Sequence, residues 1–554
     1  MHEYFEAEMR LLREAAQEFA AKYPEQARML NLSAINDRDP YIERLLEGFA
    51  FLTAQIRHKI DDDIPEICAS LLWQLWPHLL RPFPSATIVQ FKSRPGQLQQ
   101  TYTIPKGTML QSQQPAVCRF RTTSSVKLNP IQITEVKTGG SAIKLKLQIT
   151  PGVTGDDLNL DQLKIYLHAD PGLALLLHFV LLRQTKQIKI IFPEYPTHQE
   201  IIIGTEHSIK PTHFDIENIL LPQNKRSFLG FHLLHEYFLF REKYLFITLP
   251  KLQPNLWPKP CQQIIIVIQT KEIFSHDIQI NQDNFCLHCA PAINLYTETS
   301  EPIKLDHKQS EYPVLIDGAN RILHSVDEVT ATEEITGQRH IYQPLYAVDK
   351  HYYQIIFRDE KGYISFDLAE ATQQEISCEI TVSDGHYPRR FLQENTLSIA
   401  AGNLPNYIQF ANIIRPTPMF SPPKRNNYRW TLISQLALNY ESITNLPNLQ
   451  QLLTIYDWSK YHENTRRIQS IYELQVTPIN QVYQGALTQG LRFDLKVYED
   501  AFSSMADIHL FGLVLHHFFS MYISINYFVI TRIFCHPSNQ EFTWQPLFGA
   551  NYPI

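Results

Sequence analysis

The residues of this chain best suited to chemistry are two cysteines in the segment Cys286-Leu287-His288-Cys289, which has C-x-x-C spacing. Thiolates bind zinc, but a zinc site normally has four ligands, and His307 is the one further candidate nearby. Thiols at this spacing also carry out redox exchange, for which we expect the motif after a strand and at the start of a helix. We interpret the pair as buried structural thiols, with zinc binding and redox exchange as the alternatives.

Two shorter polar groups resemble parts of metal-binding motifs. His235-Glu236 begins like the zinc motif H-E-x-x-H, but Leu239 stands where the second histidine is needed. We therefore assign His235 to a packed, aromatic-rich helix. Asp61-Asp62-Asp63 offers carboxylates for a hard cation, but adjacent side chains on a helix point in different directions. A solvated helix end, or a cap of the next helix, is the favoured interpretation.

Motifs that mark the common enzyme classes are missing from the sequence. It contains no G-x-S-x-G, no G-x-x-x-x-G-K-[ST] and no G-x-G-x-x-G. The chain has 19 glycines, roughly half of what average usage gives, so phosphate-binding glycine loops are not expected. We predict that the protein is not an enzyme and binds no cofactor or metal. A hydrolase or transferase with an unrecognised site is the alternative.

Composition and charge indicate which cellular compartment and which kinds of binding partner to expect. The formal net charge is −7 over 554 residues, without the basic excess of a nucleic-acid-binding protein. The 7 cysteines are odd in number and scattered, which favours buried thiols in a reducing cytoplasm over a disulfide framework. The sequence is charged from Glu3 onward and lacks the apolar core of a secretion signal. We expect a cytoplasmic protein with no nucleic-acid partner.

Among the elements that would position these residues, segment 39–57 has the clearest pattern. Asp39 can cap a helix, and Pro40 suits the first helical position. Gly48 costs about 1 kcal/mol relative to alanine, which a close packing partner would offset. Apolar residues follow at steps of three and four, which predicts one helical stripe: Ile42, Leu45, Leu46, Phe49, Leu52, Ile56 and Ile60.

The flanking segments predict two more helices, at 3–22 and from about 64 to 77. The first has a heptad-like seam of Phe5, Met9, Leu12, Ala16 and Phe19. The helices either pack on one another or on the rest of the chain, or one seam is filled by another protein. For the second case we expect contacts from both segments: Leu12, Phe19, Arg44, Leu46, Phe49 and Arg57.

Beyond residue 84 the sequence consists mainly of short β-branched runs separated by Pro, Gly, Asn or Asp, which is typical of antiparallel sheet. Strands are predicted at 86–92, 102–104, 131–136, 142–149, 162–167, 187–192, 244–249, 263–269, 470–476 and 491–498, and helices at 172–182, 228–241, 430–437 and 446–456. We predict an α+β protein with an N-terminal helical segment and several β-rich mixed domains. The expected divisions are 1–84, 85–270 (β-rich α+β), 271–414 (second β-rich) and 415–554 (C-terminal α+β).

Residues 510–530 contain no Asp, Glu, Lys or Arg. This length is sufficient to span a bilayer, but the run includes His516, Ser524 and Asn526. We predict one buried helix, with a transmembrane helix as the alternative. The core-facing stripe is expected to be Leu513, Phe518, Met521, Ile525 and Phe528. His517, Ser520 and Ser524 are expected on the polar or partner-facing side.

Seven motifs, in order along the chain, resemble the TssF family of the bacterial type VI secretion system, also called ImpG or VasA. The first is D-P-x-[VI]-E-R-L-L-E-[GA]-F-A-F-L at the helix of segment 39–57. Others resemble L-x-R-P-x-P-S, C-x-F-R-T, S-F-x-G-Y-R-L-L-x-E-Y-F, C-x-P-x-x-N-L-F, W-x-L-I-S-x-L-x-L-N and the final helix. They lie at 79–85, 118–123, 227–238, 289–296, 430–439 and 518–528.

The resemblance implies a structural protein with a phage baseplate wedge-like fold. It implies a wedge in which two TssF copies embrace one TssG, with TssK linking the wedge to the membrane complex. TssE and the sheath would lie on one side, and the VgrG spike at the centre. The implied location is the cytoplasmic, inner-membrane-docked baseplate, without direct membrane insertion, where the subunit supports assembly of the sheath and tube.

Overall fold

The computed structural model describes residues 79–549 except 114–116, 196–199, 223–229, 273–278, 306–308, 319, 334–336, 345–351, 359–360, 367–373, 403, 424–431, 433–442, 484–485 and 524–525. Nearer the N-terminus it describes residues 5–6, 8–12, 15–16, 22, 44–55 and 72. The chain divides into two compact units, 1–80 with 423–438 and 81–422 with 439–554. The described residues form both helices and sheets, so the predicted α+β class is confirmed, with sheet predominating.

The first unit is helical in the residues described. A continuous helix covers residues 44–55, and residues 5–6, 8–12, 15–16 and 22 are also helical. Leu72 and Leu432 are helical and fully buried. The helices predicted at 39–57 and 3–22 are therefore confirmed over these residues. Asp61-Asp62-Asp63 and most of the helices predicted at 64–77 and 430–437 lie outside the described residues.

The second unit begins with a six-stranded sheet in the order β24-β3-β4-β15-β1-β25. Along β1, Val89 and Phe91 are buried while Lys92 is exposed, the alternation of a sheet with one face in the core. The ribbon of β2 and β5 packs against the same core. The strands are β1 (Ala86–Ser93), β2 (Tyr102–Ile104), β3 (Met109–Ser112), β4 (Arg119–Thr122), β5 (Val126–Leu128), β15 (Cys289–Ile293), β24 (Leu397–Ala400) and β25 (Ile408–Asn412). This sheet takes strands from both 85–270 and 271–414, and that division stays a prediction.

Two further sheets lie largely within residues 131–287. The five-stranded sheet has the order β10-β9-β13-β7-β6, and the four-stranded sheet has the order β11-β12-β8-β14. In β13 the isoleucines Ile264, Ile266 and Ile268 are all fully buried. The strands are β6 (Ile131–Gly139), β7 (Ala142–Ile149), β8 (Lys164–Leu167), β9 (Thr185–Ile191), β10 (Ile201–Thr205), β11 (Lys210–Pro211), β12 (Phe246–Thr248), β13 (Gln263–Thr270) and β14 (Phe285–Leu287).

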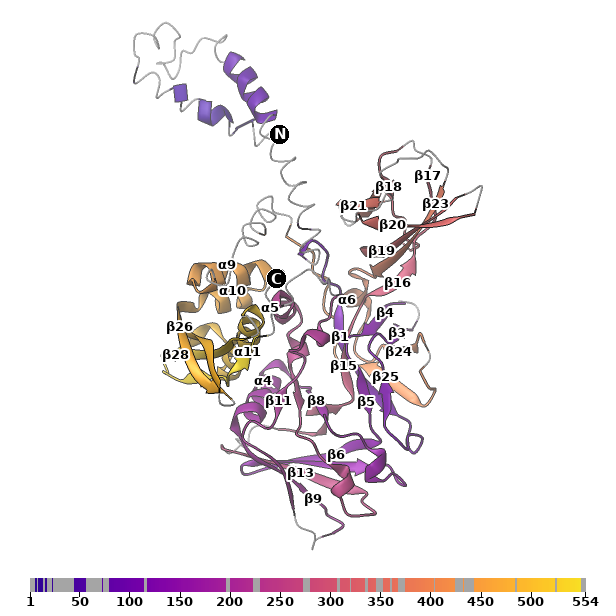
Figure 1. The fold of residues 1–554 in the computed structure, drawn as a ribbon, viewed down its shortest axis with the longest axis vertical. Coiled ribbons are helices and arrows are strands. Elements are labelled where there is room, and N and C mark those ends of the chain that lie inside the picture. Colours follow the sequence, from indigo (N-terminus) through magenta and orange to yellow (C-terminus); the bar gives the residue numbers. More distant parts are fainter. Residues whose placement is uncertain are drawn as a thin grey trace. The chain divides into compact units, whose positions relative to one another are not determined.

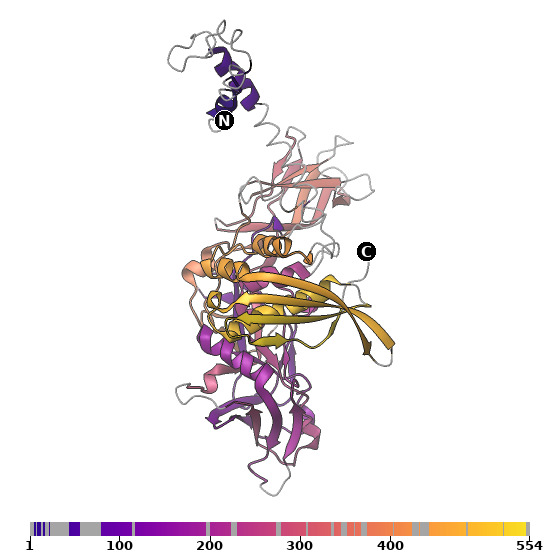
Figure 2. The ribbon, with the colours of Figure 1, turned by 90° about the vertical axis from the view of Figure 1, so that its left-hand side faces the viewer.

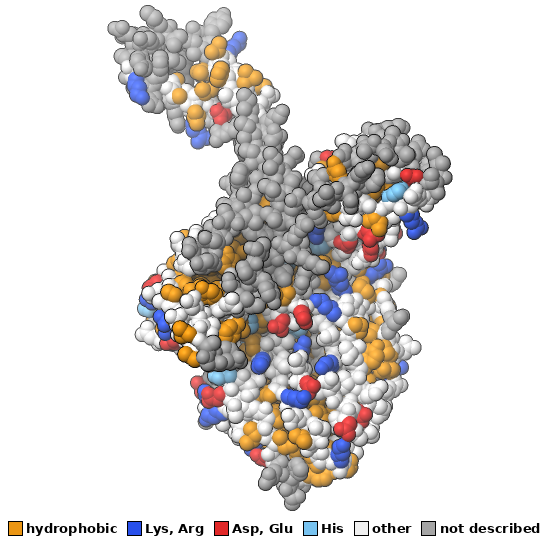
Figure 3. Space-filling model, viewed as in Figure 1, with side chains coloured by type: hydrophobic (Ala, Val, Ile, Leu, Met, Phe, Trp, Pro, Cys, Tyr) orange, Lys and Arg blue, Asp and Glu red, His pale blue; other side chains and the backbone are white. Residues whose placement is uncertain are grey.

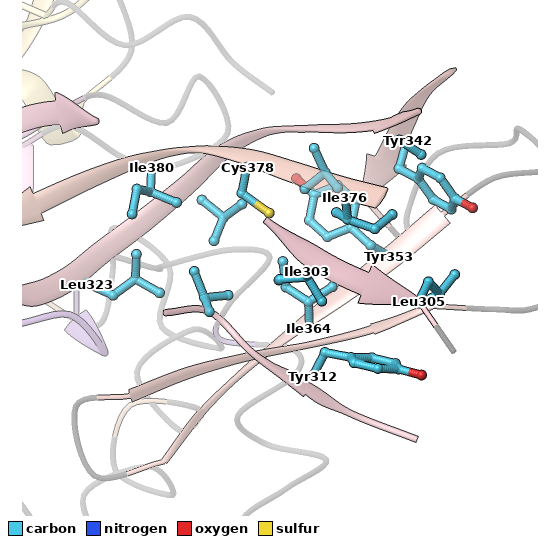
Figure 4. Packing of buried hydrophobic residues seen from close by; sticks show 14 of the residues in the cluster. Ile303, Leu305, Tyr312, Leu323, Tyr342, Tyr353, Ile364, Ile376, Cys378 and Ile380 are labelled. Atoms are coloured by element: carbon cyan, nitrogen blue, oxygen red, sulfur yellow. The ribbon is translucent and has the colours of Figure 1, made fainter. Parts of the chain in front are cut away.

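An eight-stranded sheet module is inserted between β15 and β24. Its main order is β16-β23-β19-β20-β21-β22-β18, with β17 paired to β23. Figure 4 shows isoleucines, leucines and tyrosines of these strands pointing toward one another in the module's own core. The strands are β16 (Tyr296–Thr299), β17 (Ile303–Leu305), β18 (Tyr312–Pro313), β19 (Ile322–Glu333), β20 (Arg339–Pro344), β21 (Tyr352–Arg358), β22 (Lys361–Phe366) and β23 (Gln374–Ser383).

The chain enters this module after Asn294 and leaves it at Asp384, and these two residues bond to each other. Asn294 Nδ2 donates to Asp384 Oδ2 (2.6 Å), and the backbone N–H of Asp384 donates to Asn294 Oδ1 (2.8 Å). The hydroxyl of Tyr296 donates to Asp384 Oδ1 (2.7 Å). Buried hydrogen bonds thus hold together the two segments that connect the module to the six-stranded sheet.

Helices of the second unit gather against a C-terminal sheet. Helix α11 packs on β28 and contacts α5 and α4, and Figures 1 and 2 show the helices on one face of the sheet. The helices of this group are α4 (Pro171–Phe179, continued by a π-helix at Val180–Gln184), α5 (Gly230–Leu239), α9 (Leu446–Tyr456), α10 (His462–Gln469) and α11 (Met505–Tyr522). The short helix α6 (Tyr387–Phe391) lies apart from them, near β4 (Figure 1). The strands are β26 (Ile471–Tyr483), β27 (Ala486–Tyr498), β28 (Phe528–His536), β29 (Glu541–Thr543) and β30 (Leu547–Phe548).

The prediction of one helix over 510–530 is wrong at its C-terminal end. Helix α11 stops at Tyr522, and Phe528 already belongs to β28, which pairs in parallel with β27. Ser520, expected on a polar side, is instead buried at 3% exposure and donates to the carbonyl of His517 (2.8 Å), while His517 is half-buried. The His517 ring stacks on Phe214 at 4.4 Å. Ser524 and Ile525 lie outside the described residues.

Candidate partner interface

Four of the six residues expected at a partner interface lie in the described part of the chain. Arg44, Leu46 and Phe49 belong to helix 44–55, and Leu12 lies in the helical stretch 8–12. Phe19 and Arg57 lie outside the described residues. Arg44 and Phe49 are exposed, whereas Leu46 and Leu12 are partly buried.

Helix 44–55 presents its large apolar side chains outward. Leu45 is 71%, Phe49 59% and Leu52 57% exposed, while Ala50 and Ala54 are fully buried. Because residues four apart lie on one face of a helix, the two alanines define the inward face and the large side chains lie away from it. Figure 3 shows hydrophobic side chains at the surface of this N-terminal part. Single exposed apolar residues are common, but several on one helix mark an interaction surface.

Gly48 lies on this helix without the close neighbour that its cost led us to expect. A Cβ placed on Gly48 would meet no atom of the described residues within 4 Å. The described part of the chain therefore does not supply the expected packing partner of Gly48. The open space and the neighbouring exposed Phe49 suit the close approach of a second helix.

The C-x-x-C motif joins two strands. Cys286 lies in β14 and Cys289 in β15, and His288 between them has a positive φ of 56°. Both thiols donate to backbone carbonyls, Cys286 to Asp283 (3.3 Å) and Cys289 to Leu287 (3.5 Å), and burial raises the pKa of Cys289. The helix start required by the redox interpretation is absent here. In the described part of the chain, no group of three His, Cys, Asp or Glu side chains suits a metal ion; His307 lies outside it.

His235 and Glu236 lie on α5, which is buried along its whole length. The His235 ring packs against aromatic rings, with its centroid 4.2 Å from that of Trp458 and 5.3 Å from that of Phe83. This agrees with its assignment to a packed, aromatic-rich helix. Glu236 Oε2 accepts from Lys243 Nζ, and both side chains are fully buried. Burial raises the pKa of Glu236 and lowers that of Lys243.

Asp507 is the centre of a second buried polar group, which the sequence analysis missed. Arg467 donates to its Oδ2 through Nε (3.2 Å) and Nη2 (2.9 Å), and Arg241 donates to Oδ1 (3.2 Å). Asp507 is fully buried, and Arg467 is 4% exposed. These bonds join α10, α11 and the turn after α5. A signal was present in the sequence, because an acidic residue three positions after Ser504 is typical of a helix start.

None of the helices in the described part of the chain has the length and apolarity needed to span a bilayer. These features together indicate a class of protein. They are the sheet-rich modules, the buried hydrogen-bonded polar groups and the exposed apolar side chains of helix 44–55. The class is that of a structural subunit that acts through its interfaces.

Comparison with known proteins gives the family. The family described as "Type VI secretion system, TssF" matches residues 1–551, so the chain belongs to the TssF family. This is a family of structural baseplate components and not of enzymes, which excludes the hydrolase or transferase alternative. The type VI secretion system component TssF1 of Pseudomonas aeruginosa is 27% identical, over 99% of this chain and 98% of that protein.

Two solved structures are also similar over most of this chain. A chain in the cryo-electron microscopy structure of a type VI secretion system TssK-TssF-TssG baseplate subcomplex has a TM-score of 0.79 and 28% identity, covering 93% of this chain and 99% of its own. A chain in the baseplate complex from the type VI secretion system has a TM-score of 0.62 and 28% identity, with complete coverage of both chains.

Proposed function

We propose that this protein is a wedge subunit of the type VI secretion baseplate and that it binds TssG through helix 44–55 and the seam of residues 8–12. The observation that carries the proposal is the outward apolar face of helix 44–55, in a chain that is similar over 93% of its length to a chain of the TssK-TssF-TssG subcomplex. Burying Leu45, Phe49 and Leu52 against a partner would stabilise the complex by roughly 1.5–3 kcal/mol for each large side chain.

The proposal extends to the rest of the machine. A second TssF copy shares the wedge, TssK joins it, and TssE, the sheath and the VgrG spike are the neighbours around which sheath and tube assembly proceeds. The wedge is cytoplasmic and docks at the inner membrane through its partners. The similarity over the complete chain to a chain in the baseplate complex from the type VI secretion system supports this extension.

Co-expression with TssG tests the first contact. We expect wild-type protein to co-purify with TssG and Phe49→Asp or Leu12→Asp to lose it. Ile202→Asp on β10 is the matched control, since Ile202 and Phe49 are each 59% exposed, and it should retain TssG. Circular dichroism establishes that each variant is folded. A folded Phe49→Asp variant that recovers TssG at wild-type yield would remove helix 44–55 from the interface.

A further inference from the structure

The six-stranded sheet has a gap between its two edge strands, β24 and β25. One end of the gap is closed by Asn412, whose Oδ1 accepts from the backbone N–H groups of Thr396 (2.9 Å) and Leu397 (3.0 Å). Beyond this bridge lies an open cavity of about 610 Å³, lined by residues of β1, β24, β25 and the loop before β25. This volume is in the range of sites that hold a small ligand or a short peptide.

Part of the outer edge of β25 carries hydrogen-bonding groups that face this gap. Ile408 N–H donates to the carbonyl of Pro405 (2.9 Å) and the carbonyl of Asn412 accepts from Asn395 N–H (2.8 Å), so the open groups lie between them. On the β1 side, Arg94 N–H donates to the carbonyl of Tyr407, and Ile413 N–H donates to that of Ile88. Because bonding alternates along an antiparallel pair, Gln409 and Ala411 also face β1. Phe410, between them, directs its N–H and carbonyl away from β1 toward the cavity. An edge with such free groups is a template for an added strand.

The side chains around the cavity give it a charge. Lys92 and Arg94 line it and are exposed, and no Asp or Glu is among its lining residues in the described part of the chain. Neither cation has a carboxylate partner among the described residues. The remaining polar lining groups are neutral, such as Asn395, Ser398 and Gln409. The site therefore favours an anionic ligand that can also pair with backbone.

We propose that this gap binds an extended acidic segment of another protein, which lies as a strand beside β25 and pairs with the backbone N–H and carbonyl of Phe410. Charge complementarity identifies the occupant, because two unpaired cations face a cavity without carboxylates. Lys92 and Arg94 are two residues apart on the chain, which in a strand is roughly 7 Å. Acidic residues at alternate positions of the added segment have the same spacing. The site is separate from helix 44–55 and involves none of its residues.

The probe is a fluorescein-labelled pentapeptide, Thr-Glu-Val-Glu-Thr, with blocked ends, titrated with the full chain and followed by anisotropy. We expect saturable binding that weakens at high salt, since exposed charges are screened. A peptide with lysine at both glutamate positions should not bind. A peptide N-methylated at alternate residues keeps its charges but cannot complete the backbone ladder, and it should also fail to bind.

Protein variants locate the site. Lys92→Glu with Arg94→Glu should weaken binding by roughly tenfold or more, because two favourable charge pairs become repulsive. The matched control reverses two exposed cations elsewhere, Lys304→Glu with Arg339→Glu in the eight-stranded module. It should change binding by less than about twofold.

Several results would overturn the proposal. They are no binding at roughly millimolar peptide, equal binding by the Lys92/Arg94 variant, and equal binding by the N-methylated peptide. Binding of pyrophosphate, lost in the Lys92/Arg94 variant while the peptide does not bind, would make the gap a phosphate site instead. Self-association lost in that variant would make a second copy the occupant, also against the proposal.

Discussion

Helix 44–55 and helix α11 both carry many apolar side chains, but these side chains differ in how far they are exposed to solvent. In α11 nearly every side chain is buried, including the charged Asp507 and the imidazoles of His509 and His516. In helix 44–55, Leu45, Phe49 and Leu52 face outward while two alanines face inward. The charge of Asp507 is thus buried together with its arginine partners. The exposed apolar side chains of helix 44–55 are what we expect of a surface that another protein covers.

The largest effect on the free energy of unfolding is expected at Asp507, the buried carboxylate of α11. Asp507→Ala should lower the free energy of unfolding by about 3–5 kcal/mol, because Arg467 is left buried without its carboxylate. Chemical denaturation measures it. Glu463→Ala is the control; its side chain is 81% exposed although it also pairs with Arg467, and we expect a change below about 1 kcal/mol. Equal losses in both variants would show that burial of the charge does not set its importance.

The buried pair of Glu236 and Lys243 offers a second test of how much a buried charge depends on its partner. Glu236→Gln should cost about 3 kcal/mol, since it leaves the Lys243 ammonium without an opposite charge. The double variant Glu236→Gln, Lys243→Met should recover at least about 1 kcal/mol of that loss, because the residues are directly coupled. Denaturation of the three proteins gives both numbers. Additive losses in the double variant would contradict the coupling.

Acid should destabilise the folded chain because several of its histidines are buried. Burial lowers the pKa of His232, His288 and His516 to about 4, against about 6.5 in the unfolded chain. The unfolded chain therefore takes up protons first, so this stability is complete above about pH 6.5 and is lost as the pH falls toward 4. At pH 5 the loss is roughly 2 kcal/mol per histidine.

A single variant isolates one of these histidines. His516 Nδ1 bonds with Thr531 Oγ1 (3.0 Å), a contact that a neutral amide can replace. We expect His516→Gln to flatten the fall in the free energy of unfolding between pH 7.5 and 5 by roughly 2 kcal/mol. An unchanged pH profile would mean that His516 is accessible to protons in the folded chain.

The smallest effect on stability is expected in the exposed helix. Phe49→Asp should change the free energy of unfolding of the isolated chain by less than about 0.5 kcal/mol, since surface substitutions usually do. Thermal unfolding of the isolated chain and co-purification with TssG are measured together. A loss of several kcal/mol in the isolated chain would place Phe49 in a core and end the contrast with α11.

The sequence predicted local elements well where a single period governs them. Helix α9 has the bounds expected, Leu446–Tyr456, and β7 and β13 match their predicted runs to within one residue. The end of α11 was missed because apolar residues continue from the helix into β28. Buried helix and buried strand are both apolar throughout, so composition alone does not separate them.

The sites were harder to predict because they depend on contacts distant in sequence. Asp507 and Arg467 are 40 residues apart. The position of Asp507 after Ser504 indicates a helix start, but nothing in the sequence identifies Arg467 as its partner. The stripe of helix 44–55 was found, but its periodicity does not say whether the partner is this chain or another. The gap between β24 and β25 arises from strand order, which brings together residues more than 300 positions apart.

The paired hydrogen bonds of Asn294 and Asp384 have a consequence for how this chain changes over evolution. Since the module of 296–383 enters and leaves the six-stranded sheet at one fastened point, its ends lie together as a loop's ends do. Its strands can therefore lengthen, shorten or be exchanged without altering the register of β15 with β1. Homologous chains can therefore differ in the surface that this module offers to other molecules while the six-stranded sheet keeps its strand pairing.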